Sequence, residues 1–197
     1  MKATRTKLEG VMVLEPQVHA DERGSLFESF SEARFNELTG EEHTFVQDNH
    51  TTSRAGVLRG LHYQSPPRAQ GKLLRVLRGA IFDVAVDIRR DSRTFGRWLG
   101  LLLSAENRKQ LWIPAGFAHG FLALTECEVL YKMDAYYDPA LQQSIRWDDP
   151  AIGISWPLSG KPVLSPKDEA AGSMQQFSGF PAVAGAMDDL VRLQSFD

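Results

Sequence analysis

The 197-residue sequence contains one cysteine, Cys127, and no long run of apolar residues. A lone cysteine excludes an internal disulfide framework and a zinc site built on several cysteines. Its strand-like surroundings favour a small core residue over a nucleophile. Residues 1–8 carry no apolar signal region, and no stretch approaches the roughly 20 apolar residues that cross a bilayer. We therefore expect a cytoplasmic protein without a membrane partner.

A strong positive charge is also missing. The formal net charge is −3 and the isoelectric point is about 6.0, which argues against nucleic acid as a partner because that role needs a basic face. Hydrophobic residues make up 43% of the chain and charged residues 24%, as in globular proteins. No repeat, low-complexity tract or linker divides the sequence. We expect one domain over residues 1–197.

The hydrophobic pattern predicts a protein built mainly from strands. One helix is expected over 31–40, with Ser31 as its N-cap and Gly40 at its end. Residues 81–88 alternate between the two sides of a strand, which predicts one face against a core. Further strands are expected at 72–77, 97–103, 110–113, 121–124 and 128–133, with a turn at 114–116 and a short helix near 186–194. Short, regularly spaced strands indicate a β-sandwich or barrel whose interior can hold a pocket.

His62 lies within an unusual group of cationic and amide side chains. An isolated histidine is most often a structural residue. Here the neighbouring side chains are Gln47, Asn49, Arg54, Arg59, Arg68, Lys72 and Arg75. Arginine is the residue best suited to bind phosphate, so the group fits an anionic ligand. A solvated basic face explains the composition equally well, and composition alone leaves both interpretations open.

Three other positions have a structural and a functional interpretation. His119 follows an apolar turn, so it is either a hydrogen-bonded core histidine or a contact for a ligand. Tyr131 and Tyr137 are six residues apart and would share a face of a regular strand, where tyrosines usually pack. Asp168 follows Lys167 in what reads as an ordinary charged loop. Spacing alone does not bring Asp168 near His62.

Metal-binding cupin barrels resemble this strand pattern and the turn before His119. Their first motif carries a His-x-His pair followed by a glutamate, whereas this chain has His62, Tyr63 and Gln64 followed by Arg68 and Lys72. Two histidines in a cationic pocket suit a divalent metal poorly, since the metal needs neutral or anionic ligands. We therefore predict no metal.

Motifs along nearly the whole chain resemble the dTDP-4-dehydrorhamnose 3,5-epimerase family. The matching segments are 21–30, 47–49, 56–64, 70–73, 83–87, 110–121, 131–132, 136–137, 145–150 and 164–168. The resemblance implies an all-β jelly-roll β-sandwich or barrel of the cupin-like kind, with a few short helices. It also implies a homodimer in which the N-terminal segment, about 1–45, contributes to the interface and to the partner's site.

The resemblance further implies roles for individual residues. His62 resembles the general base, Tyr131 the general acid, Asp168 the carboxylate that orients the base, and Lys72 the lysine beside the substrate ketone. Tyr137 resembles the tyrosine that stacks on thymine. The remaining substrate-binding positions are Arg23, Glu28, Gln47, Asn49, Arg59, Lys72, His119, Gln142 and Lys167. Gln142 stands near a position where many members have glutamate, and His19 and Ser25 stand where aromatic residues are common.

The expected reaction inverts C3 and C5 of dTDP-4-dehydro-6-deoxy-D-glucose in dTDP-L-rhamnose biosynthesis. The C4 ketone acidifies the neighbouring C–H groups, a base of near-neutral pKa removes a proton, and a fixed cation stabilises the resulting oxyanion. A second acid must then deliver a proton to the opposite face. No redox change occurs, so no cofactor is expected. The alternatives are a single-site epimerase acting at C3 or C5, a metal-dependent cupin enzyme and a non-catalytic sugar-nucleotide binder.

Overall fold

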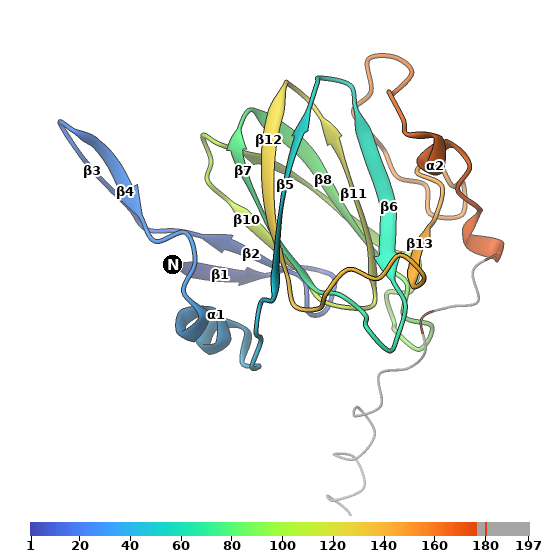
Figure 1. The fold of residues 1–197 in the computed structure, drawn as a ribbon, viewed down its shortest axis with the longest axis horizontal. Coiled ribbons are helices and arrows are strands. Elements are labelled where there is room, and N and C mark those ends of the chain that lie inside the picture. The colour runs from blue at the N-terminus through green and yellow to red at the C-terminus, as the bar shows by residue number, and fades with distance from the viewer. Residues whose placement is uncertain (177–179, 181–197) are drawn as a thin grey trace, which may run out of the picture.

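Two antiparallel sheets face each other in the computed structural model, which describes residues 1–176 and 180 (Figure 1). The six-stranded sheet contains, in spatial order, β1 (Lys2–Arg5), β2 (Met12–Glu15), β10 (Gln110–Ile113), β7 (Lys72–Arg78), β12 (Cys127–Met133) and β5 (Gln47–Ser53). The five-stranded sheet contains β13 (Gln142–Ser144), β6 (Leu58–Gln64), β11 (Phe117–Ala123), β8 (Ala80–Asp87) and β9 (Trp98–Ser104). Successive strands repeatedly cross between the two sheets. This arrangement confirms the predicted cupin-like jelly roll.

The core lies between the sheets and continues beyond one of them. Leu74, Ile81 and Leu111 are fully buried in the cluster that fills the sandwich. Val84 and Val86, on the other face of β8, pack in a second cluster with residues of the C-terminal segment. The prediction of a single core-facing side for this strand was wrong, because the C-terminal segment covers the face that would otherwise meet solvent.

The helix α1 (Glu32–Thr39) is capped as its sequence predicts. The backbone N–H of Arg34 donates to Ser31 Oγ at 3.4 Å, and Gly40 takes a left-handed conformation with φ of 79°. Phe35 is 1% exposed and its ring contacts Trp112 edge-on, with centroids 5.1 Å apart. The other helical turns among the described residues are α2 (Pro166–Glu169) and a 3₁₀ turn over Met174–Gln176.

Most predicted strands agree with the structure to within one or two residues. The exception is the segment predicted over 121–124, since β11 begins at Phe117 and includes His119. Every residue of this strand is buried because β11 lies between β6 and β8 at the centre of its sheet. Cys127 is buried at 1% exposure, as expected for a core residue. The helix predicted near 186–194 lies outside the described residues.

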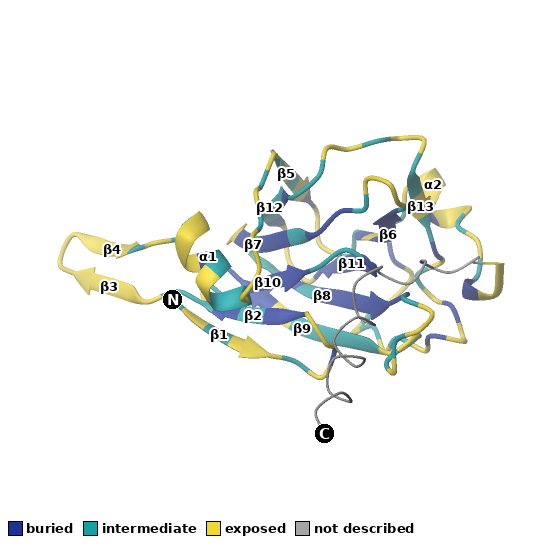
Figure 2. Cartoon of the chain, turned by 90° about the horizontal axis from the view of Figure 1, so that it is seen from below, coloured by how far each residue is buried: buried dark blue, intermediate teal, exposed yellow. Residues whose placement is uncertain are grey.

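A two-stranded hairpin, β3 (Val18–Asp21) and β4 (Gly24–Phe27), extends away from both sheets (Figure 1). Figure 2 shows it almost entirely exposed, in contrast with the buried central strands. Leu26 is 75% exposed, which is unusual for a leucine in a strand. Along β4, Arg108 Nη2 donates to Ser25 Oγ at 3.0 Å and the guanidinium lies over the Phe27 ring. Among the described residues, no helix is long and apolar enough to cross a membrane.

Candidate active site

A cavity of about 230 Å³ opens between the two sheets. Strands from both sheets supply its walls, and the loop after β12 supplies part of its rim. The lining residues are Asn49, Thr51, Arg59, His62, Tyr63, Gln70, Lys72, His119, Phe121, Tyr131, Met133, Tyr137 and Gln142. Most of the residues predicted from the sequence therefore meet in one cavity, although they are separated by up to 93 positions in the chain.

His62 and Asp168 form a close pair at this cavity. His62 Nε2 lies 2.5 Å from Asp168 Oδ1, so the two groups share a short hydrogen bond. Asp168 is 3% exposed and also accepts a hydrogen bond from the Ser165 hydroxyl at 2.9 Å. Burial alone would raise the pKa of Asp168, but the hydrogen bonds from His62 and Ser165 and the interaction with His62 outweigh it, so the pKa lies below its ordinary value.

The local structure of α2 explains how Asp168 reaches His62. Ser165 caps the helix by accepting the backbone N–H of Asp168 at 3.1 Å, and Pro166 occupies the first turn. The cap fixes the carboxylate against β6, across a sequence separation of 106 residues. With Nε2–H donating to the carboxylate, Nδ1 of the imidazole carries the free lone pair. This arrangement suits a histidine that acts as a base.

Lys72 brings a cation to the same cavity from β7. Its Nζ lies 3.5 Å from the backbone oxygen of His62. Burial lowers the pKa of Lys72 to about 8, and the nearby carboxylate of Asp83 only partly opposes this effect. The ammonium is thus charged at neutral pH but poorly solvated. A poorly solvated cation stabilises a nearby developing anion more strongly than one in water.

A second histidine–carboxylate pair lies beside the first. His119 Nε2 is 2.8 Å from Asp83 Oδ1, and Asp83 is fully buried. Burial lowers the pKa of His119, although the charge of Asp83 and its hydrogen bond work in the opposite direction. Asp83 Oδ2 has no hydrogen-bond partner among residues 1–176 and 180. Sequence reasoning did not assign Asp83 to the site; the available signal was a carboxylate within a strand of otherwise apolar, buried residues.

Tyr131 enters the cavity from the sheet opposite to that of His62. It lies on β12, in register with Asn49 of β5 and Leu74 of β7, whereas His62 lies on β6. Burial raises the pKa of Tyr131, with a hydrogen bond from Asn49 and the charge of Arg59 acting in the opposite direction. The phenol therefore stays protonated at neutral pH and can donate a proton.

Polar residues at the rim are linked to one another. The Tyr137 hydroxyl donates to Gln142 Oε1 at 2.7 Å, and its backbone N–H donates to Gln47 Oε1 at 2.9 Å. Gln47 Nε2 donates in turn to Asn49 Oδ1 at 2.9 Å. β12 ends at Met133, so Tyr137 lies in a loop instead of continuing the strand face of Tyr131. Both tyrosines nevertheless line the cavity.

Arg59 anchors one side of the rim. Its Nε donates to Ser53 Oγ at 3.0 Å and its Nη2 donates to the backbone oxygen of Thr52 at 3.1 Å. These two hydrogen bonds fix the orientation of the guanidinium, and Arg59 remains exposed to solvent. Thr51, which sequence reasoning also missed, lines the cavity with a buried hydroxyl that has no partner within the described part of the chain.

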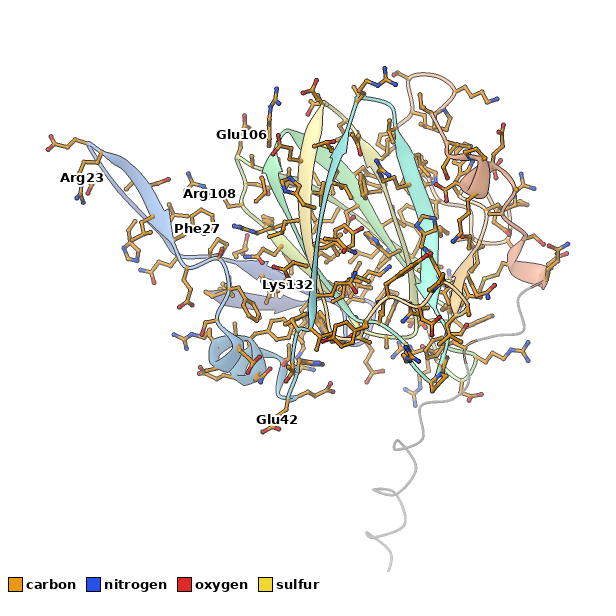
Figure 3. All side chains as sticks on the ribbon, in the orientation of Figure 1. Arg23, Phe27, Glu42, Glu106, Arg108 and Lys132 are labelled. Atoms are coloured by element: carbon orange, nitrogen blue, oxygen red, sulfur yellow. The ribbon has the colours of Figure 1, made fainter. Side chains whose placement is uncertain are left out.

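Four predicted substrate contacts do not line the cavity of a single chain: Arg23, Glu28, Gln47 and Lys167. Gln47 is bonded to the lining residues Tyr137 and Asn49. Arg23 lies at the tip of the β3–β4 hairpin, paired with Asp21 at 2.5 Å, and Figure 3 shows it far from the barrel. Glu28 follows the same hairpin and is exposed. Lys167 is exposed on α2, beside the buried Asp168. Their roles stay predictions.

The described residues contain no group of three or more His, Cys, Asp or Glu side chains that could hold a metal ion. His62 and His119 face each other across β6 and β11, but each is hydrogen-bonded to its own carboxylate through Nε2. The prediction that no metal is required calls for a direct test.

A jelly-roll barrel with a histidine–aspartate pair on one wall and a tyrosine on the other defines the class of cupin-like epimerases. A family model described as dTDP-4-dehydrorhamnose 3,5-epimerase matches residues 5–176. The chain belongs to this family, and it is an isomerase.

Individual relatives agree with the family assignment. The dTDP-4-dehydrorhamnose 3,5-epimerase of Salmonella typhimurium is 55% identical over 177 residues, covering 89% of this chain and 97% of that protein. The dTDP-6-deoxy-D-glucose-3,5-epimerase of Legionella pneumophila, solved with dTDP-4-keto-L-rhamnose, has a TM-score of 0.86 and 49% identity, covering 88% of this chain and 93% of that one. A 3′-monoepimerase from Streptomyces bikiniensis, solved with dTDP-quinovose, has a TM-score of 0.84 and 36% identity, covering 90% of this chain and 91% of that one.

Proposed function

We propose that the chain inverts C3 and C5 of dTDP-4-dehydro-6-deoxy-D-glucose to give dTDP-4-dehydro-L-rhamnose, in dTDP-L-rhamnose biosynthesis. The proposal rests mainly on one observation: His62 and Tyr131 lie on opposite sheets, and both line the cavity between them. Inversion of a carbon requires a proton to leave from one face and another to arrive at the opposite face. Two acid–base groups on facing walls meet this requirement.

His62 acts as the base in this mechanism. Nδ1 removes the proton next to the C4 ketone, while Nε2–H stays bonded to Asp168. The carboxylate holds the ring orientation and stabilises the imidazolium that forms. Asp168 keeps its negative charge because its pKa is already lowered in the folded protein. When His62 takes up the proton, the imidazolium therefore pairs directly with the Asp168 carboxylate, and no second proton has to move.

Lys72 stabilises the negative charge that moves to the C4 oxygen. Its ammonium is fixed by β7 and poorly solvated, as the pKa of about 8 reflects. Tyr131 then protonates the carbon from the opposite face, and its raised pKa keeps the phenol protonated until that step. Arg59 and His119 complete the polar wall around the sugar. Removal and return of a proton change no oxidation state, so the chemistry needs no redox partner.

The nucleotide lies at the rim of the cavity in this proposal. Tyr137 stacks on the base, while Gln47, Asn49 and Gln142 supply amide groups for polar contacts. Lys167, exposed on α2, is assigned to a phosphate of the nucleotide. A cytoplasmic location agrees with a highly charged substrate of this kind, which does not cross a bilayer unaided.

We also infer that the chain acts as a homodimer, which explains where Arg23 and Glu28 function. The β3–β4 hairpin extends from its own barrel with Leu26 75% exposed, and an isolated two-stranded hairpin is only marginally stable in water. β5 is a free edge of the six-stranded sheet, and it carries the cavity residues Asn49 and Thr51. If the hairpin of a second copy lay along this edge, it would cover the exposed Leu26 and bring Arg23 to the rim of the cavity.

Incubation with dTDP-4-keto-6-deoxyglucose in D₂O, followed by NMR, tests the reaction. Inversion with deuterium incorporation at both C3 and C5 is the expected result. Label and inversion at only one of these carbons would instead identify a single-site epimerase. Absence of exchange at both carbons would overturn the proposed chemistry.

Sedimentation analysis across a dilution series tests the dimer, and a monomer with full activity at low concentration would contradict it.

A further inference from the structure

The loop after β12 carries Tyr137 and pairs with no strand in the part of the chain that the structure describes. Residues 134–138 lie between β12 and β13, outside both sheets. Buried backbone N–H and C=O groups need hydrogen-bond partners, and a loop cannot obtain them from a ladder. The groups that satisfy this loop therefore determine how firmly it is held.

Gln64 makes the largest number of these contacts. Its side chain is 2% exposed at the end of β6, two residues from His62 on the same strand. Its Nε2 donates to the backbone oxygen of Tyr136 at 3.0 Å and also to that of Arg68. Its Oε1 accepts the backbone N–H of Asp138 at 2.8 Å. One buried amide thus holds the loop on both sides of Tyr137.

Two other glutamines hold the residues between these points. Gln70, which is 7% exposed, donates from Nε2 to the backbone oxygen of Ala135 at 2.8 Å. Gln47 accepts the backbone N–H of Tyr137 itself at 2.9 Å. Each of the residues 135–138 is therefore bonded through its backbone to a glutamine side chain, and the three glutamines come from three different segments of the barrel.

An amide is well suited to this task because it offers a donor and an acceptor on one planar group. A carboxylate could not donate to the loop carbonyl groups, and an ammonium could not accept from the loop N–H groups. An amide is also neutral, so it adds no net charge near His62 and Lys72. The clamp therefore holds the loop at any pH at which the protein is folded.

We propose that Gln64 and Gln70, together with Gln47, form an amide clamp that holds Tyr137 in place to bind the planar base of the substrate. This inference rests on the proposed function, since it takes Tyr137 as the platform for that base. Gln64 and Gln70 are positioning residues, because they act on the base through Tyr137. A preorganised platform binds more tightly because less conformational freedom is lost on binding.

The test is Gln64→Met, which keeps the size of the side chain but leaves three backbone groups without their partner. We expect the Kd for dTDP, measured by calorimetry, to rise roughly tenfold because the loop must be ordered on binding. We expect KM to rise similarly, while kcat changes less than about threefold because the His62–Asp168 pair is untouched. Gln70→Met, which removes one contact, should show a smaller change of the same kind.

A double-mutant cycle with Tyr137→Ala separates positioning from general damage. If the clamp acts through Tyr137, Gln64→Met should weaken dTDP binding by less than about twofold once that ring is absent. The matched control is Asn107→Leu. Asn107 also holds three backbone groups, donating to Leu102 and accepting from Ser104 and Lys109, but it lies in the turn before β10 and does not line the cavity.

The outcomes separate this proposal from the function on which it rests. Asn107→Leu should lower the melting temperature without changing the Kd for dTDP. Wild-type affinity in folded Gln64→Met and Gln70→Met, or an equal loss with and without the Tyr137 ring, would overturn the clamp while leaving the epimerase proposal intact. A wild-type protein that does not bind dTDP at all would overturn the proposed function and the role of the clamp in binding together.

Discussion

Replacing Lys72 with methionine should stabilise the folded protein while removing most of its activity. Methionine has a similar length but carries no charge into the cavity. In the folded protein, the pKa of Lys72 is lowered from its ordinary 10.5 to about 8, chiefly by burial. One pKa unit corresponds to about 1.4 kcal/mol, so keeping this ammonium charged costs at most roughly 3.5 kcal/mol. Side-chain relaxation reduces the cost, and we expect a gain of about 1–2 kcal/mol in the free energy of unfolding at pH 7.

The pH dependence of this gain follows from the direction of the pKa change. Because the pKa is lower in the folded state, the folded protein binds fewer protons than the unfolded chain between pH 8 and 10.5. The wild type should therefore gain stability as the pH rises through this window, while below pH 8 the cost is present in full. The advantage of Lys72→Met should be largest at pH 7 and should shrink towards pH 10.

Urea denaturation at pH 7 and pH 10 measures this difference, and NMR measures the rate of inversion. We expect kcat to fall by about 10²–10³ because the oxyanion loses its cation. In the wild type, kcat should also fall as the pH rises above 8 and Lys72 loses its proton. A variant that is less stable than the wild type at pH 7, or whose stability difference does not change with pH, would refute the account of Lys72 as a desolvated cation.

Three further outcomes are expected. His62→Ala should abolish both inversion and deuterium exchange at C3 and C5, whereas Tyr131→Phe should retain exchange while inversion falls by about 10²–10⁴; equal loss of both processes in Tyr131→Phe would rule out Tyr131 as acid alone. Arg59→Ala and Arg23→Ala should each weaken binding through loss of a charge-assisted contact, by about 1.5–3 kcal/mol for Arg59, and calorimetry with dTDP and with substrate measures the loss; unchanged affinities in both variants would show that the basic group is only a solvated face. Full activity should survive exhaustive chelation, and activity restored only by added metal would contradict a metal-independent mechanism.

Local pattern predicted β7 to β12, whereas β1 to β6 and β13 were not assigned from the sequence. The strand over residues 81–88, the caps Ser31 and Gly40, and the turn at 114–116 rest on short-range features, and each has its expected place in the structure, although β8 is covered on both faces and not on one. The start of β11 was missed because the apolar residues around His119 have no alternation. A central strand buried on both faces has no polar side to reveal it.

The sequence alone determined that the chain is a mainly β protein, and its motifs pointed to the family and to His62, Lys72 and Tyr131. Only the tertiary structure decided that Asp168, which reads as surface charge, is 3% exposed and bonded to His62 across 106 residues. It alone revealed the pairing of Asp83 with His119 and the lowered pKa of Lys72. The physical reason is that strand periodicity depends on neighbouring residues, whereas burial, hydrogen-bond partners and pKa values depend on segments that folding brings together from distant parts of the chain.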